Sequence, residues 1–272
     1  MRLSRFVLLT LGTVTAAACG GSDVTTPNVP PLSSVRFINA LSDTGAVDVR
    51  AVDQVAYSPV ANNLAYRAAT VYQNAAVGVR HFRVFPTSTN INVTSGVLAD
   101  VLVTLPANTK ITLLVTGSAR AGTVGLWVID DGVAAPAAGQ VSVRLVNTAS
   151  SLINGYLVNT SSDPLPGTAT YSGVLALAPS AYVSRTAGVA AITVTDVGST
   201  LVTASADGPP APATLVGEKP AAGVTSPGTS FSAYYFAPGA AGSQNAAVSS
   251  YSLIWFVDRN PCDVPAVAAC TP

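Results

Sequence analysis

Short runs of alternating apolar and polar residues recur along the chain after its N-terminal stretch. Val35 and Phe37 share one face of such a run and Val47 and Val49 share another, with a turn-like segment, 41–45, between them. A period of two residues is typical of β-strands, whose successive side chains point to opposite faces. The same pattern predicts strands at 81–85, 98–105, 110–116, 125–130, 231–236 and 251–258. No segment shows a sustained helical face with caps, so we expect an all-β protein.

One connection is short enough to suggest a specific motif. The predicted strands at 98–105 and 110–116 are separated only by Pro106-Ala-Asn-Thr109. Two strands joined by a four-residue loop usually form a β-hairpin. We therefore expect these two strands to pair with each other.

The chain also contains an internal repeat. Ser34-Val-Arg-Phe-Ile-Asn-Ala40 is echoed by Ser142-Val-Arg-Leu-Val-Asn-Thr148 at a constant offset (142 − 34 = 108). In addition, 231–236 corresponds to 111–115, and both copies end in a Trp-containing strand that reaches an Asp. A period of about 100 residues matches one β-sandwich domain. We therefore predict two tandem immunoglobulin-like antiparallel β-sandwich domains.

These features divide the chain into six segments. They are a leader (1–19), a flexible linker (20–33), domain 1 (34–132), a linker (133–140), domain 2 (141–260) and a C-terminal tail (261–272). Within domain 2, the Gly- and Pro-rich run at 207–229 predicts a long irregular loop, a kind of segment that often carries function.

The leader has the three parts of an export signal. A basic start, Met1–Arg5, precedes a short apolar run, and Ala16-Ala-Ala-Cys19 follows. The small residues and the cysteine resemble a bacterial lipobox, in which Cys19 is lipidated, although Ala16 stands where Leu is usual. The Gly/Ser/Pro-rich stretch after Cys19 suits a tether. We therefore expect a lipoprotein, and Gly20 favours the outer membrane; ordinary cleavage after Ala18, giving a secreted protein, is the alternative.

Composition excludes some partners. Hydrophobic residues make up 49% of the chain, charged residues 10%, and the formal net charge is zero. A chain of this kind folds, but it has no basic surface to attract nucleic acid. We expect no cofactor and no nucleic-acid partner.

Two cysteines lie close together near the C-terminus. Cys262 and Cys270 are most simply a disulfide after export. A redox-active pair is more often Cys-x-x-Cys, and zinc would need further ligands. The expected role is structural.

Other polar residues give weak signals for chemistry. His81 is the single histidine, lies between arginines and has no Gly-x-Ser-x-Gly segment to partner it, so we interpret it as an outward-facing strand residue. Asp130, Asp131 and Asp258 suggest calcium only loosely and are better explained as turn formers. Arg36 and Arg144 recur inside apolar strands, where an outward position or a role in tying sheets together through carbonyl groups is the simplest reading.

Aromatic residues are concentrated near the end of domain 2. Tyr234, Tyr251 and Trp255 are candidates for a surface that stacks on sugars or contacts a partner. Core packing is the competing interpretation, because alternation sends some of these rings inward.

The Ser-Val-Arg-x-x-Asn opening, the following Ala46-Val-Asp-Val49 and the Asp-ending strand resemble the bacterial domain-of-unknown-function family 4397. The resemblance covers most of 34–131 and, more loosely, 142–258, where Gly155-Tyr-Leu157 departs from it. It implies tandem β-sandwich modules in secreted proteins or lipoproteins. The family brings no known catalytic residues.

Three functions remain open at this point. The first is a non-catalytic, membrane-anchored envelope lipoprotein that binds or scaffolds an unknown protein or glycan partner. The second is a secreted or surface adhesin or carbohydrate-binding protein that uses the aromatic residues of domain 2. The third is a hydrolase whose site is assembled from scattered Asp and Ser residues.

Overall fold

The computed structural model describes residues 30–53, 60–210 and 223–261. The leader with Cys19, and the pair Cys262 and Cys270, lie outside these residues. From Pro31 onward the chain forms one compact unit. Within the described residues, no helical segment has the length and hydropathy of a membrane span.

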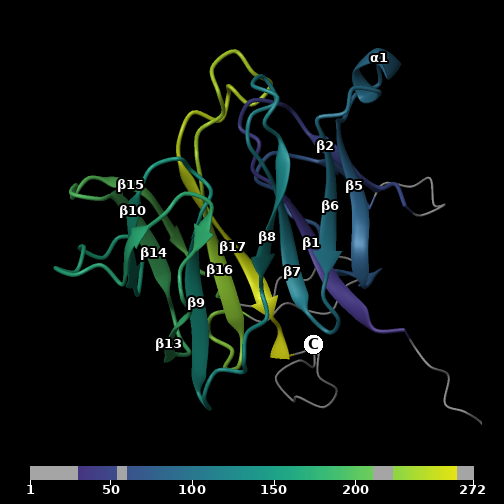
Figure 1. The fold of residues 1–272 in the computed structure, drawn as a ribbon. Helices are drawn as coiled ribbons and strands as arrows, with labels where there is room; N and C mark the ends of the chain where they lie inside the picture. Colours follow the sequence, from purple (N-terminus) through teal and green to yellow (C-terminus); the bar gives the residue numbers. More distant parts are fainter. Residues whose placement is uncertain (1–29, 54–59, 211–222, 262–272) are drawn as a thin grey trace, which may run out of the picture. The chain divides into compact units, whose positions relative to one another are not determined.

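The first half of this unit contains two four-stranded sheets (Figure 1). Sheet A has the order β4-β1-β7-β8, and sheet B has the order β3-β2-β5-β6. One short helix, α1, connects β5 to β6. The elements are β1 (Leu32–Asn39), β2 (Val47–Ala51), β3 (Ala61–Leu64), β4 (Gln73–Ala76), β5 (Gly78–Pro86), α1 (Ile91–Thr94), β6 (Ala99–Leu105), β7 (Lys110–Thr116) and β8 (Gly125–Asp130).

The second half repeats this arrangement. Sheet C has the order β12-β9-β16-β17, with β13 also on β9, and sheet D has the order β11-β10-β14-β15. The elements are β9 (Gln140–Asn147), β10 (Ile153–Val158), β11 (Tyr171–Val174), β12 (Ala178–Pro179), β13 (Val183–Thr186), β14 (Ala191–Asp196), β15 (Val202–Asp207), β16 (Ser230–Phe236) and β17 (Ser252–Arg259). The all-β prediction is confirmed as two sandwich-like bodies.

The expectation of purely antiparallel sheets is wrong for one strand pair in each half. β1 pairs with β7 in parallel, and β9 pairs with β16 in parallel. The registers correspond, since Arg36 lies opposite Thr112 and Arg144 lies opposite Ser232. Parallel partners need a long crossover, and here the crossover passes through the other sheet of the same body.

The expected hairpin between 98–105 and 110–116 is also wrong. Both segments are strands, but β6 pairs with β5 in sheet B, whereas β7 pairs with β1 and β8 in sheet A. The segment 106–109 crosses between the sheets, and the N–H of Asn108 donates to the carbonyl of Leu32 at 2.9 Å. The short loop alone could not distinguish an arch between sheets from a hairpin within one.

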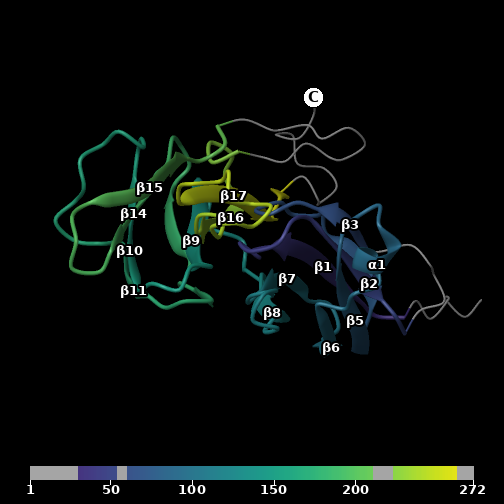
Figure 2. The same cartoon turned by 90° about the horizontal axis from the view of Figure 1, so that it is seen from above.

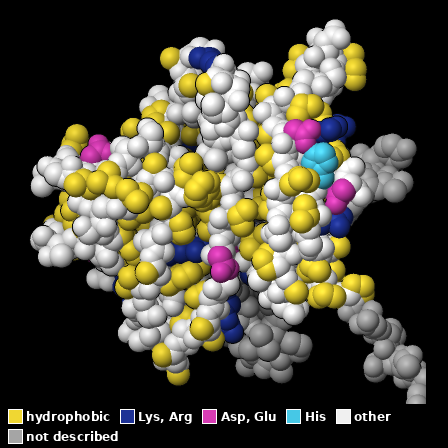
Figure 3. All heavy atoms as spheres, in the orientation of Figure 1, with side chains coloured by type: hydrophobic (Ala, Val, Ile, Leu, Met, Phe, Trp, Pro, Cys, Tyr) yellow, Lys and Arg dark blue, Asp and Glu magenta, His cyan; other side chains and the backbone are white. Residues whose placement is uncertain are grey.

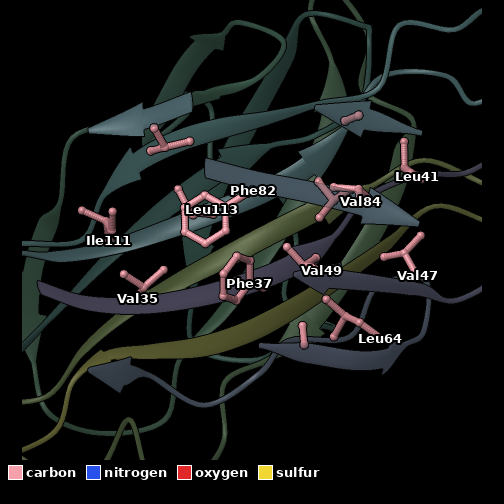
Figure 4. Close-up of a cluster of buried hydrophobic side chains, with 14 of the residues drawn as sticks. Val35, Phe37, Leu41, Val47, Val49, Leu64, Phe82, Val84, Ile111 and Leu113 are labelled. Atoms are coloured by element: carbon pink, nitrogen blue, oxygen red, sulfur yellow. The ribbon is translucent and has the colours of Figure 1, made fainter. Parts of the chain in front are cut away.

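Each sandwich encloses its own apolar core. In the first, Val35 and Phe37 of β1 pack with Phe82 and Val84 of β5 and with Leu113 of β7 (Figure 4). In the second, Val143 and Leu145 occupy the positions of Val35 and Phe37. Because alternate side chains of one strand point to opposite faces, the residues between them leave these cores.

Those outward side chains are buried as well, because sheet A packs against sheet C (Figure 2). Ile38 and Leu114 from the first half meet Val146, Tyr234 and Phe236 from the second in a third apolar cluster. β1, β7, β9 and β16 are thus buried on both faces, which explains why they read as nearly continuous apolar runs.

Candidate functional site

The most highly organised polar cluster lies between sheets A and C and is built from the repeated arginines. Arg36 and Arg144 are each 3% exposed. Val35 and Phe37 point into the core of the first sandwich, so Arg36 points away from it, toward the second. Arg144 points toward the first sandwich for the same reason.

Each arginine binds the other half of the chain. Arg36 Nη2 donates to Asp258 Oδ1 at 2.9 Å, and Arg36 Nη1 donates to the carbonyl of Val257 at 3.1 Å. Reciprocally, Arg144 Nη2 donates to Asp131 Oδ1 at 2.5 Å. Arg144 Nη1 donates to the carbonyl of Asp130 at 2.7 Å. We call this pair of exchanged contacts the interlock.

Each arginine is also held by its own half. Arg36 Nε donates to Thr112 Oγ1 at 3.0 Å, and Arg144 Nε donates to Ser232 Oγ at 2.7 Å. Each guanidinium carbon lies 4.6 Å from the centre of a tyrosine ring, Tyr72 for Arg36 and Tyr182 for Arg144. Such cation–π contacts favour the charged form in a desolvated place.

The carboxylates of Asp131 and Asp258 accept hydrogen bonds from equivalent hydroxyl groups in the two halves. Tyr72 and Thr112 donate to Asp131 Oδ2 at 2.8 and 2.6 Å. Tyr182 and Ser232 donate to Asp258 Oδ2 at 2.9 and 2.5 Å. In each aspartate, Oδ2 therefore accepts hydrogen bonds from its own half of the chain, and Oδ1 accepts one from the arginine of the other half.

Burial shapes the ionisation of this cluster. Burial tends to lower the pKa of Arg36. The electrostatic effects of Tyr72, Tyr234 and the two carboxylates are larger in sum, and the pKa of Arg36 lies well above its ordinary value. Burial raises the pKa of Asp131, an effect reinforced by Asp258 and opposed by the two guanidinium groups. Burial also raises the pKa of Tyr72 and Tyr182. The phenols therefore serve as neutral donors.

The aspartates at the strand ends differ from the prediction. Asp131 and Asp258 are 1% and 0% exposed, so neither is a surface turn former. Asp130 does form a turn, because its Oδ1 accepts from the N–H of Gly132 at 2.8 Å. Among the described residues, no group of three or more His, Cys, Asp or Glu side chains is placed to hold a metal ion.

The predicted aromatic surface is not formed as a set. Tyr234 has no exposed surface and lies in the cluster between the sheets, so its candidacy is corrected to core packing. Trp255 packs edge-on against Phe231 at 6.0 Å and donates Nε1 to the carbonyl of Ala206. Tyr251 remains 37% exposed, stacked on Tyr235.

The two tryptophans are also not equivalent. Val128 pairs with Leu113, whereas Trp255 pairs with Ala233, so Trp255 matches Val128 rather than Trp127. A shift of one residue sends a side chain to the opposite face. Trp255 packs against the second core, whereas Trp127 and Val128 of β8 are both exposed, at 47% and 46%.

Other polar residues lie apart from the interlock. His81 lies on β5 at the outer face of sheet B, where it contacts Asp100, which also accepts from Arg83 Nε at 2.8 Å.

A cavity of about 490 Å³ opens at the ends of β1, β7, β8 and β17, beside the interlock. Its polar lining includes Lys110 and Arg259 together with Asp130, Asp131 and Asp258, so the two carboxylates of the interlock lie at its wall.

Sequence reasoning missed the two tyrosines. Thr70-Val-Tyr72 and Ser180-Ala-Tyr182 are equivalent at an offset of 110 (180 − 70 = 110). The hydroxyls of Thr70 and Ser180 accept from the backbone N–H groups of Phe37 and Leu145, one residue after each arginine. This Thr/Ser-x-Tyr repeat was the available signal.

Residues 33–154 match DUF4397, a domain of unknown function. The DUF4397 match covers the strands of the first sandwich and continues through β9 into β10. It thus contains Arg36, Asp131 and Arg144, but not Asp258. Among curated proteins, none matches the chain.

Two solved structures illustrate the similarity to known folds. One shows α-glucan recognition by family 41 carbohydrate-binding modules from streptococcal virulence factors, with 11% identity, 64% of this chain and 86% of that chain covered, and a TM-score of 0.21. The other is the family CBM26 module CBMbc from Eubacterium rectale Amy13K in complex with maltoheptaose, with 12% identity, 88% and 100% covered, and a TM-score of 0.24.

Removing one member of the interlock should be costly. Asp258→Ala leaves Arg36 buried without its carboxylate, and we expect the free energy of unfolding to fall by about 3–5 kcal/mol. Urea denaturation measures this loss. Asp130→Ala, which removes an exposed carboxylate nearby, should cost less than about 1 kcal/mol. The double change Arg36→Met with Asp258→Leu should restore most of the lost free energy of unfolding. Equal losses for Asp258→Ala and Asp130→Ala would contradict the role assigned to Asp258 in the interlock.

The raised pKa of Asp131 predicts a pH dependence. The folded protein binds this proton more tightly than the unfolded chain does. Its contribution to stability is therefore full below the unfolded pKa of about 3.9 and is lost as pH rises through the folded pKa. The free energy of unfolding of the wild type minus that of Asp131→Asn should decrease across this window in denaturant titrations. A difference that increases with pH would show that the pKa is lowered instead.

Proposed function

We propose that this chain is a non-catalytic lipoprotein of the bacterial cell envelope, anchored through lipid on Cys19, whose paired sandwiches bind or scaffold a protein or glycan partner. The leader pattern and the Gly/Ser/Pro-rich stretch that follows Cys19 support the anchor. The first strand starts at Leu32, so the folded unit follows this stretch directly.

The interlock is the observation that carries the non-catalytic part of the proposal. The charged residues that recur in the sequence are buried, bonded to one another and saturated by hydroxyl groups. A catalytic carboxylate has to reach substrate. Asp131 and Asp258 lie at the wall of the cavity, but they are only 1% and 0% exposed and are bonded within the chain. The repeated residues therefore support a role in architecture.

Loop contacts add to the support for a rigid platform. Asn245 Nδ2, in the connection between β16 and β17, donates to the carbonyl of Leu41 at 3.0 Å. The N–H of Ala240 donates to the carbonyl of Ser42 at 2.8 Å. Arg120 Nη1 donates to the carbonyl of Ala241 at 2.9 Å. The loops around these contacts are held in fixed relation, as a binding or scaffolding surface requires.

Metabolic labelling tests the anchor. Cells grown with radiolabelled palmitate should yield a labelled wild-type protein in the membrane fraction, because lipid attaches at Cys19. The variant Cys19→Ser should be unlabelled. A wild-type protein that is exported into the medium without label would contradict lipidation and favour ordinary cleavage after Ala18. Protease treatment of intact cells then distinguishes a surface orientation from a periplasmic one.

A further inference from the structure

The outer face of sheet B carries a row of charged side chains. Val84 of β5 points into the core of the first sandwich, so its neighbour Arg83 points outward. The register places Arg50 of β2 opposite Arg83, and Arg83 opposite Asp100 of β6. Figure 3 shows acidic, basic and histidine side chains gathered over β5 and β6. We call Arg50, Arg83 and Asp100 the charged row.

The second sandwich has no such row at the equivalent place. In both halves the register of the second strand is irregular, and the irregularity ends at Val49 in β2 and at Gly155 in β10. These two residues are therefore equivalent, and the row begins one residue further along. The residues of the second half at its three positions are Tyr156, Thr193 and Ser205. The sandwich thus forms without these charges, whereas the arginines of the interlock recur in both halves.

The acidic groups on this face have partners other than Arg50. Asp100 Oδ2 accepts from Arg83 Nε at 2.8 Å, and Asp100 Oδ1 contacts His81. Asp48 is 8% exposed, and its Oδ1 accepts from a backbone N–H at 2.8 Å and from a hydroxyl group at 2.7 Å. Two arginines directly opposite each other on neighbouring strands tend to destabilise a sheet. Only one of the two is neutralised by Asp100.

Arg50 is held in place without a hydrogen bond. Its guanidinium carbon lies 4.9 Å from the centre of the Phe85 ring, and it makes no hydrogen bond or ion pair with any described residue. Every other arginine among the described residues binds a carboxylate or a carbonyl group of the chain. A guanidinium group fixed by stacking, with its donors unused, is suited to the paired oxygens of an oxyanion.

We propose that the charged row binds an acidic polysaccharide, with a carboxylate or sulfate group held between the guanidinium groups of Arg50 and Arg83. β5 lies between β2 and β6, so its backbone is already paired and an extended peptide cannot add to it as a strand. Val79 and Leu102, 61% and 69% exposed, border the row and offer apolar contact to sugar rings. The proposal rests on the binding role proposed above and specifies the class of partner.

Affinity electrophoresis tests this site. The chain from Gly20 onward contains the whole compact unit, and it is run in native gels that contain polygalacturonate, dextran sulfate or neutral dextran. We expect one or both acidic polymers to retard the protein, less so as salt is added, and neutral dextran to have no effect. Polygalacturonate offers carboxylate and dextran sulfate offers sulfate, so the polymer that retards the protein identifies the oxyanion.

Variants then assign the binding to the row. Arg50→Gln should raise the Kd for the retarding polymer about tenfold, because charge-assisted hydrogen bonds are lost. Arg50→Lys keeps the charge but not the planar fork, and should restore only part of the affinity. Arg120→Gln is the matched control: it removes the same charge from the β7–β8 connection, where Arg120 donates to the carbonyl of Ala241, and should leave the Kd unchanged. Circular dichroism confirms that the variants are folded.

Four results would overturn the proposal. They are retardation by neither acidic polymer, equal retardation by neutral dextran, equal effects of Arg50→Gln and Arg120→Gln, and stronger retardation by poly-L-glutamate than by either acidic polysaccharide. Each would count against this site alone. The anchor at Cys19 is judged separately by palmitate labelling, which does not depend on the charged row.

Discussion

The structure depends on a reciprocal exchange of charge between its two halves. Arg36 of the first half binds Asp258 of the second, and Arg144 of the second binds Asp131 of the first. The four charges sum to zero, and each sits in a place that is nearly closed to water. Buried ion pairs contribute little net stability, but an unmatched buried charge is expensive. The exchange therefore penalises any arrangement in which sheets A and C slide out of register, and it converts two sandwiches into one unit.

The sequence repeat has a physical explanation in these contacts. In the Ser-Val-Arg-x-x-Asn motif, the valine fills a core, the arginine crosses to the other half, and the asparagine shapes the next turn. Asn39 Oδ1 accepts from the N–H of Leu41 at 2.9 Å, and Asn147 Oδ1 accepts from the N–H of Ala149 at 3.0 Å. Recurrence within one chain thus reflects the fold.

Much of the fold could be predicted from alternation and repetition, because strands and equivalent strands leave a local signature. The all-β class and the strands at 110–116 and 231–236 followed from the residues themselves. Pairing did not, since the short segment 106–109 reads the same whether it joins strands in one sheet or in two. The partners of Arg36 were also hidden, because Asp258 lies 222 positions away in the sequence. Tyr234 and Trp127 show that the face of the sheet on which an aromatic side chain lies can be predicted only when the strand register is known.

The unit has two ends of different character. The interlock borders the cavity lined by Lys110 and Arg259 at the end where β1 begins, and the connections that follow β1, β7, β9 and β16 lie at the other end. This division follows from the parallel pairs, which make the equivalent strands of both halves finish together. A repeat of one sandwich therefore doubles the loops available at a single end, whereas the charged motif remains inside.

Differential scanning calorimetry tests the central claim, that the interlock makes the two sandwiches one cooperative unit. The chain from Gly20 onward should unfold in a single transition whose calorimetric and van't Hoff enthalpies agree. Asp258→Ala, which breaks one arm of the exchange, should separate this transition into two. Two independent transitions in the wild type, at temperatures unaffected by Asp258→Ala, would contradict the account.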